Sequence, residues 1–182
     1  PTKQTQPPFP EAVWLLSLNN KIGLYLHVPF CDSKCAYCDF YSYRADVAVY
    51  DRYTDTLCRH LQLCGESLKS SADTLYFGGG TPSLLGGERI ARLVSAARSA
   101  FSLQEAEITV EANPADRLVY DFELMAKAGV NRISLGVQSS DNGELKALSR
   151  RHNCSDVKRT VCDAKAVGIE NISLDLMLGI PH

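Results

Sequence analysis

The sequence predicts an α/β fold in which helices cover a parallel β-sheet. Short apolar runs, typical of buried strands, alternate with longer stretches whose apolar residues recur every three or four positions, as in amphipathic helices. Successive strand-like runs lie roughly 25–50 residues apart, the spacing that strand–helix–strand units require. This alternation favours parallel strands joined by crossover helices. By itself it does not distinguish a barrel from an open, doubly wound sheet.

The first strand and the first helix flank a loop rich in cysteine. Residues 22–28 form an apolar run that we expect to be the first strand. Residues 46–68 are expected to be helical because apolar positions recur there at helical spacing, namely Val49, Tyr53, Leu57, Leu61 and Cys64. Residues 1–20 contain several Pro, Gln and Asn residues and are expected to be a flexible lead-in. Within it, residues 12–18 fit either a short helical turn or an edge strand.

The remaining elements continue the alternation to the end of the sequence. Further strands are expected at residues 74–77, 107–111, 132–137 and 171–177. Helices are expected at residues 87–100 and 116–128, with Gly129 as a suitable C-cap, and over a stretch interrupted near residues 151–153 that closes at Gly168. The last strand has no helix after it and would leave an exposed edge.

Composition limits the classes of protein that the chain can belong to. The 182 residues are 45% hydrophobic and 22% charged, which suffices for one domain with a real core. A net charge of −2 provides no basic field for nucleic acid. No apolar run approaches the roughly 20 residues of a membrane span, and no signal peptide pattern opens the chain. We therefore expect a cytoplasmic protein without nucleic acid partners or an integral membrane segment.

Three cysteines, Cys31, Cys35 and Cys38, lie in a C-x3-C-x2-C spacing directly after the first strand. Thiolates are preferred ligands of iron–sulfur clusters and zinc. Three thiolates on one loop suit a [4Fe–4S] cluster that leaves one iron open. A structural zinc site would need a fourth Cys or His, and we expect the strand to point the nearby His27 elsewhere. Disulfides are the other alternative, although the total of seven cysteines is odd.

Other unusual residues also fall where the expected strands end. Gly78–Pro82 follow the second strand, Glu111 and Asn113 end the third, Gln138 ends the fourth, and Asp175 lies in the fifth. The C-terminal ends of parallel strands meet at one edge of a sheet. The glycine run lacks the spacing of nucleotide-binding loops, but glycines let the backbone approach a ligand closely. We therefore predict a ligand site at this edge, with a plain tight turn as the alternative for the glycines.

The string HVPFCxxxCxYCDF around the cysteines resembles the radical S-adenosylmethionine (SAM) superfamily. Within it, the sequence is similar to the family of oxygen-independent coproporphyrinogen III oxidases, HemN, and the HemW-type haem chaperones. The resemblance implies an incomplete parallel (βα)6 barrel, with about five strands present and truncated at the C-terminus. Residues 21–182 would then be the N-terminal part of the barrel domain.

The same resemblance implies the cofactors and the residues that hold them. Cys31, Cys35 and Cys38 would bind a [4Fe–4S] cluster whose open iron holds SAM. An electron donor such as flavodoxin or ferredoxin would reduce the cluster, which cleaves SAM to methionine and a 5′-deoxyadenosyl radical. Implied SAM contacts are Tyr25, Tyr37, Gly79, Gly80, Thr81 and Glu111, with Gln138, Arg150 and Asp175 matching contacts to a second SAM in the oxidase.

Several of these positions also have plainer interpretations. Arg150 is followed by Arg151, so the register of this match is open, and an arginine on a helix surface is common. Asp175 in an apolar strand is costly unless it is paired or functional. His152 fits a helix cap or a solvent-facing position. The other cysteines are expected to pack as small apolar residues: Cys58, Cys64, Cys154 and Cys162.

Phe40 separates the two branches of the resembled family. The oxidases carry a further cysteine at this place, whereas Asp39-Phe40-Tyr41-Ser42 resembles HemW, as does Gly136-Val137-Gln138-Ser139. The resemblance therefore implies a SAM-binding iron–sulfur protein that binds haem or a porphyrin and hands haem to an acceptor protein. Alternatives are a true coproporphyrinogen oxidase, a HemN-like methyltransferase or cyclopropane-forming enzyme, and a non-catalytic zinc-binding module.

Overall fold

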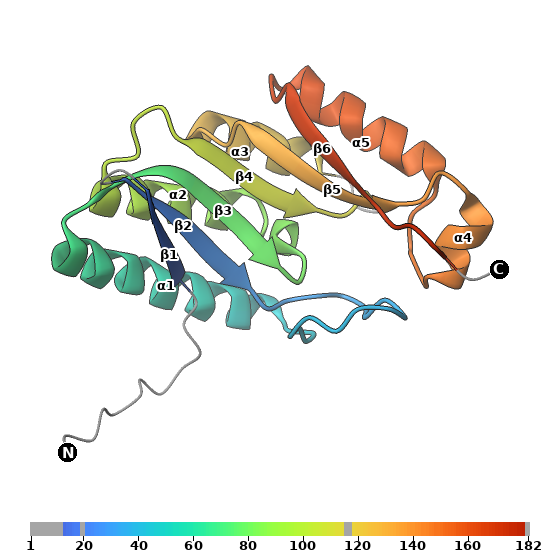
Figure 1. Cartoon of the computed structure of the whole chain (residues 1–182), viewed down its shortest axis with the longest axis horizontal. Coiled ribbons are helices and arrows are strands. Elements are labelled where there is room, and N and C mark those ends of the chain that lie inside the picture. The colour runs from blue at the N-terminus through green and yellow to red at the C-terminus, as the bar shows by residue number, and fades with distance from the viewer. Residues whose placement is uncertain (1–12, 19–20, 115–117, 181–182) are drawn as a thin grey trace, which may run out of the picture.

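A six-stranded sheet runs in chain order through the protein (Figure 1). The computed structural model describes residues 13–18, 21–114 and 118–180. The five predicted strands are confirmed and are mutually parallel, with a sixth strand at one edge. The strands are β1 Val13–Leu18, β2 Lys21–Val28, β3 Ser71–Gly79, β4 Glu107–Ala112, β5 Arg132–Gln138 and β6 Asn171–Leu176.

β1 is an edge strand, which decides between the two alternatives for residues 12–18. It pairs antiparallel with β2, from Val13 opposite Leu26 to Leu18 opposite Lys21. Antiparallel strands can be close neighbours in the sequence, as β1 and β2 are. The rest of the expected lead-in, residues 1–12 and 19–20, lies outside the described residues, and the division of the chain at residue 20 stays a prediction.

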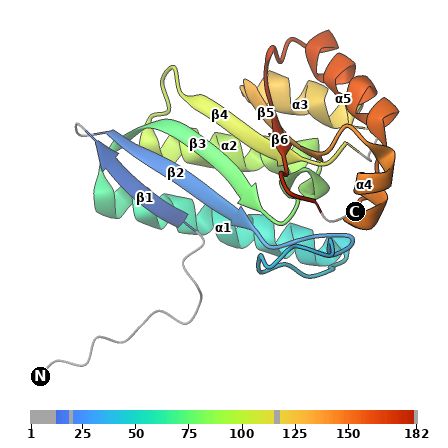
Figure 2. The same cartoon turned by 45° about the vertical axis from the view of Figure 1, so that its right-hand side comes forward.

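The long helices form one layer on one face of the sheet (Figures 1 and 2). Each packs on the next in chain order, α1 on α2, α2 on α3 and α3 on α5. The helices are α1 Val47–Leu68, the 3-10 helix η1 Pro82–Leu85, α2 Gly87–Phe101, α3 Val119–Ala128, α4 Asn142–Ala147 and α5 Cys154–Ala166. Right-handed crossovers that always step in the same direction place every helix on the same side. The fold is therefore a partial barrel rather than a doubly wound sheet.

Side chains at the helix starts explain where two of these helices begin. The Asp46 carboxylate accepts a hydrogen bond from the Val49 N–H at the start of α1. Asn153 and Asp156 form a capping box at the start of α5. Such caps satisfy backbone donors that have no partner within the helix. The interruption expected near residues 151–153 is thus a real break between α4 and α5. None of the helices in the described part of the chain is both long and apolar enough to cross a membrane.

The two faces of the sheet differ in polarity. In β2, alternate residues from Ile22 to Val28 are buried against the helices. The opposite face carries Tyr25 beside Tyr76 in one row of paired residues, and Glu111 beside Ser134 in another. A parallel sheet covered by helices on both faces has apolar residues on both. Here the uncovered face is polar, as the inside of a ligand-binding barrel requires.

Backbone hydrogen bonds tie the cysteine loop to the glycine loop after β3. The Gly80 N–H donates to the Val28 carbonyl at 2.8 Å, and the Thr81 N–H donates to the Phe30 carbonyl at 2.7 Å. The loop closes on itself through the Cys31 N–H, which donates to the Tyr43 carbonyl at 3.1 Å. The two loops therefore form one packed unit at the C-terminal end of the sheet.

Gly80→Ala is expected to destabilise this unit. A Cβ at Gly80 would lie 2.3 Å from the Phe30 carbonyl oxygen, which is backbone and cannot move aside alone. Overpacking of this kind costs about 1–3 kcal/mol, which urea unfolding would measure. Gly143→Ala on exposed α4 is the control, because its nearest neighbour is the Asp141 side chain. Equal stability of Gly80→Ala and the native protein would contradict the close packing of the two loops.

Candidate functional site

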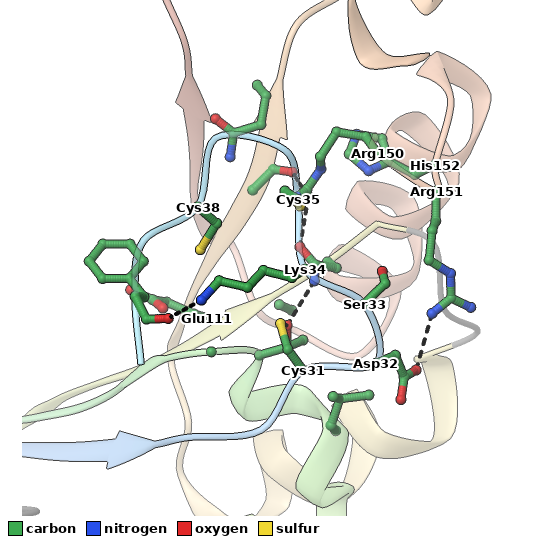
Figure 3. A pocket seen from close by; sticks show the side chains of 18 of the residues that line it. Cys31, Asp32, Ser33, Lys34, Cys35, Cys38, Glu111, Arg150, Arg151 and His152 are labelled. Carbon is green, nitrogen blue, oxygen red and sulfur yellow. Dashed lines mark hydrogen bonds and ion pairs between the residues drawn. The ribbon is translucent and has the colours of Figure 1, made fainter. Parts of the chain in front are cut away.

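A cavity of about 280 Å³ opens at the C-terminal ends of the strands (Figure 3). This volume approaches the range of small-molecule sites, roughly 300–1,000 Å³. Side chains from the cysteine loop, from the ends of β3 to β6 and from the segment after α4 line it. All predicted site residues except Tyr25 are among them, namely Cys31, Cys35, Tyr37, Cys38, Gly79, Gly80, Thr81, Glu111, Gln138, Arg150 and Asp175.

Tyr25 lies outside the lining, behind Gly78. Its hydroxyl is 3.2 Å from His27 Nδ1, and its ring stacks on Tyr76 with 6.0 Å between centroids. A Cβ at Gly78 would come within 2.8 Å of the Tyr25 ring, so glycine there lets the tyrosine fit. Burial, with the nearby Glu111 carboxylate, raises the pKa of Tyr25. A direct contact between Tyr25 and SAM stays a prediction, and the structure places Tyr25 as a support for the glycine loop.

The thiols of Cys31, Cys35 and Cys38 are free and lie along one loop at the cavity (Figure 3). Among the residues that the structure describes, no three His, Cys, Asp or Glu side chains are grouped to hold a single metal ion. A tetrahedral zinc would need its thiolates about 3.8 Å apart. A cluster offers each thiolate its own iron, so the three thiols need not converge on one ion. His27 faces away, as predicted, and its Nε2 lies 3.4 Å from the Tyr41 carbonyl.

Glu111 is a half-buried carboxylate at the end of β4. One oxygen accepts the Tyr76 hydroxyl proton at 2.7 Å, and the other accepts the Gly79 N–H at 3.2 Å. Burial raises the pKa of Glu111 and these two hydrogen bonds partly offset the rise, while the Asp175 charge adds to it. The two bonds fix the carboxylate beside the glycine loop, where it could accept hydrogen bonds from a ligand ammonium group.

The raised pKa of Glu111 predicts a pH dependence of stability in the metal-free protein. Folded protein holds this proton more tightly than unfolded protein, so its contribution to stability is lost as pH rises from the ordinary glutamate range through the raised value. In Glu111→Gln, which has no proton to lose, the free energy of unfolding should fall less steeply across that window. Urea unfolding at a series of pH values measures the slope. Glu66→Gln on exposed α1 is the control, and an unchanged slope in Glu111→Gln would contradict the prediction.

Arg150 and Arg151 both line the cavity but have different surroundings, and the match of Arg150 to a SAM contact stays a prediction. Arg150 turns inward, where Nη2 donates to Asn113 Oδ1 at 2.7 Å and Nη1 donates to Cys35 Sγ at 3.4 Å. Its Nε is buried without a hydrogen-bond partner in the described structure, while the side chain lines the cavity, where its positive charge would attract a ligand carboxylate. Arg151 also lines the cavity but pairs with Asp32 at 3.2 Å, and 54% of its side chain is exposed.

Asp175 is held by a chain of hydroxyl groups across the polar face of the sheet. Arg132 donates to Ser173, Ser173 to Ser134, and Ser134 to the Asp175 carboxylate, each at 3.1 Å. This donor chain starts at a positive charge and ends at a negative one, so it stabilises the carboxylate at the cavity. Asp175 is exposed and accepts this one hydroxyl hydrogen bond, so its role in binding a ligand stays a prediction.

Gln138 ends β5 with a left-handed backbone, φ 70°. Such a conformation is uncommon for a residue other than glycine and often marks a functional site. The Met177 N–H donates to the Gln138 carbonyl at 2.9 Å, which ties this turn to the end of β6. The turn brings Gln138 into the lining of the cavity.

Some sequence-based expectations were wrong or incomplete. His152 neither caps a helix nor faces solvent: it is buried, Nε2 lies 3.0 Å from the Val137 carbonyl, and burial lowers its pKa. Cys58 and Cys64 pack against the core as expected. Cys162 is exposed, and the Cys154 thiol donates to the Ser140 carbonyl at 2.7 Å, so neither is a packing residue.

Asn113, noted above only as the end of a strand, also lines the cavity. It joins Arg150 to Thr81 by hydrogen bonds from its two side-chain ends. Its position at the C-terminal end of a parallel strand was the available signal. Other lining residues had no such signal in the sequence: Asp32, Ser33, Lys34, Leu84, Ser134 and Ser149.

Comparisons with known proteins agree with this geometry. Residues 25–182 match the profile of the Radical SAM superfamily. The heme chaperone HemW of Escherichia coli K12 is 42% identical over 171 residues, covering 88% of this chain and 43% of that protein. The mouse mitochondrial radical S-adenosyl methionine domain-containing protein 1 is 35% identical, covering 97% of this chain and 39% of that protein. The chain thus spans about two fifths of these relatives.

The solved structure of the coproporphyrinogen III oxidase HemN from Escherichia coli, described as a radical SAM enzyme, superposes with a TM-score of 0.79. It is 26% identical, and the match covers 86% of this chain and 37% of HemN. The predicted α/β fold and the cofactors, a [4Fe–4S] cluster and SAM, are confirmed by this membership and by the thiols in the cavity. The chain belongs to the radical SAM superfamily and, within it, to the HemN/HemW family.

Proposed function

We propose that the protein is a haem chaperone of the HemW type, which binds haem together with SAM and a [4Fe–4S] cluster. Relatives from several bacteria that carry the name heme chaperone HemW are 35–42% identical to the chain. These identities support the proposal, and the observation that carries it lies at residue 40.

Phe40 occupies the place where the oxidases have a further cysteine. Its ring lines the cavity beside the cluster loop and is 68% exposed. A phenyl ring can neither bind a metal nor transfer a proton, so any chemistry that depends on a thiol at this place is missing. An exposed aromatic ring is suited instead to stacking on a flat apolar ligand.

The proposal assigns the lining residues to the two cofactors. Cys31, Cys35 and Cys38 hold the cluster, which supplies the electron for reductive cleavage of SAM when both are bound. Glu111 and the glycine loop orient the ammonium group of SAM, and Arg150 orients its carboxylate. Tyr37, beside the cluster, offers its ring to the adenine. Gln138 and Asp175 supply further polar contacts, including any to a second SAM.

Partners and location are part of the same proposal. A flavodoxin or ferredoxin would supply electrons to the cluster, and a haem-acceptor protein would receive the haem. The free thiols suit a reducing compartment, the cytoplasm in a bacterium.

An activity assay on the full-length protein tests the proposal. The protein is reconstituted anaerobically with iron and sulfide and given SAM, a reductant and coproporphyrinogen III. We expect no protoporphyrinogen IX, while a haem titration of the same sample gives a saturable change in the haem absorption band. Decarboxylated product would show an oxidase, the second candidate, which the likeness to HemN favours. A haem titration without saturation would refute the chaperone.

Phe40→Ala and Tyr120→Ala form a matched pair for the haem titration. Both side chains are largely exposed aromatics, but Tyr120 lies on α3, outside the cavity lining. If Phe40 stacks on the haem, only Phe40→Ala should weaken haem binding. If both variants bound haem equally well, Phe40 would not be part of the haem site. The only remaining role for Phe40 would be that it replaces the cysteine of the oxidases.

A further inference from the structure

A path of hydrogen bonds joins two of the three cluster thiols through residues that the proposed function does not use together. Arg150 Nη1 donates to Cys35 Sγ at 3.4 Å, and Arg150 Nη2 donates to Asn113 Oδ1 at 2.7 Å. Asn113 Nδ2 donates to Thr81 Oγ1 at 2.9 Å, and Thr81 Oγ1 lies 3.2 Å from Cys31 Sγ. We propose that Asn113 is a positioning residue that sets the hydrogen bonds to both thiolates and thereby tunes the reduction potential of the cluster.

The chemistry of the groups fixes the direction of every bond in this path. A guanidinium only donates, so the end of Asn113 that faces Arg150 must be its oxygen. The NH₂ group of Asn113 must then face Thr81, whose oxygen accepts the bond. The hydroxyl proton of Thr81 is left free to donate to Cys31. Each end of the path therefore donates a hydrogen bond to the sulfur of a predicted cluster ligand: Arg150 donates to Cys35 and Thr81 donates to Cys31.

The residue next to Arg150 and Asn113 in space is a glycine, which leaves room for their contact. Gly136 lies beneath the pair, and a Cβ there would come within 3.2 Å of both Arg150 Nη2 and Asn113 Oδ1. The same guanidinium nitrogen also donates to the Gly136 carbonyl. The missing side chain at residue 136 thus gives Arg150 room to reach Asn113 and Cys35 together.

Hydrogen bonds to cluster sulfurs are one of the factors that set the potential of iron–sulfur clusters. Reduction adds negative charge to the cluster, so a donor to a ligand sulfur stabilises the reduced form more than the oxidised form. The amide of Asn113 orients both donors, because its oxygen accepts from Arg150 and its NH₂ group donates to Thr81. An aspartate of the same shape would still accept from Arg150, but it would also accept the Thr81 proton and take it from Cys31.

The test is the midpoint potential of the cluster in the full-length, anaerobically reconstituted protein without SAM, followed by electron paramagnetic resonance during a redox titration. We expect Asn113→Asp and Thr81→Val to lower the potential, and Thr81→Ser, which keeps the hydroxyl, to leave it near the native value. Asn131→Ala is the control, because that amide also bonds at both ends, to Ile108 N–H and the Ala106 carbonyl, but away from the cavity. An unchanged potential in Asn113→Asp would overturn the proposal.

A double variant tests whether Asn113 acts on Cys31 through Thr81 or has only a structural role. If Asn113 acts on Cys31 through Thr81, then Asn113→Ala combined with Thr81→Val should shift the potential by less than the sum of the single shifts. Additive shifts would overturn the relay. If Asn113→Asp assembles no cluster, the midpoint potential is measured in Asn113→Ala and Gly136→Ala instead. An unchanged potential in both variants would overturn the proposal. The readout requires neither haem nor decarboxylation, so it is independent of the chaperone hypothesis.

Discussion

Replacing any one of Cys31, Cys35 and Cys38 by alanine is expected to abolish the cluster. Each thiolate would bind its own iron, and the cluster already has one iron without a protein ligand, so two thiolates remain to hold four irons. The native protein should carry about four irons with sulfide after reconstitution. The variants should carry almost none and should lose the absorption of the cluster. Iron and sulfide analysis after anaerobic gel filtration measures both.

Cys162→Ala is the matched control for this experiment. Cys162 is exposed on α5, outside the cavity lining, and its loss should leave the iron content unchanged. A single zinc in the native protein, removed by the same three substitutions, would contradict the cluster and return the site to a structural metal. Retention of four irons in any of the three variants would show that another side chain can serve as ligand.

Arg150→Met is expected to weaken SAM binding to the reconstituted protein by about 10- to 100-fold. Hydrogen bonds to a charged group contribute about 1.5–3 kcal/mol, and each 1.4 kcal/mol is about tenfold in the dissociation constant. The side chain of Arg150 lines the cavity, so its guanidinium charge is placed to attract the SAM carboxylate. Equilibrium dialysis with labelled SAM gives the affinity and the number of SAM molecules bound. The SAM affinity of Arg150→Lys should lie between those of the native protein and Arg150→Met, because lysine keeps the positive charge but lacks the planar guanidinium group.

Arg151→Met is the matched control, since the two residues are adjacent in sequence and differ in surroundings. Arg151 also lines the cavity, but it is half exposed and pairs with Asp32, and such exposed pairs contribute about 0–1 kcal/mol. Its loss should change SAM affinity by less than about fivefold. If Arg151→Met weakened binding as strongly as Arg150→Met, overall charge at the cavity rather than the inward-facing guanidinium would be responsible.

Local patterns were sufficient for most of the fold. The period of the apolar residues separates strands from helices because alternate residues share one face of a strand, whereas residues three or four apart share one face of a helix. The cysteine spacing, the glycine run and Glu111 were visible for the same reason, since each belongs to a single segment. The sequence of β1 fits both a helical turn and an edge strand. The strand forms because it pairs with β2, and the residues of β1 alone do not specify that neighbour.

The sequence by itself determined the α/β class, the order of the elements, the three candidate cluster ligands and the family. Only the tertiary structure decided that the sheet is a partial barrel, because that depends on the direction in which each strand is added. It also decided that Arg150 bonds to Asn113 while Arg151 pairs with Asp32, that His152 is buried, and that Asn113 joins Thr81 to Arg150. These contacts join segments far apart in the chain, and which side chains meet there is set by packing in three dimensions rather than by local spacing.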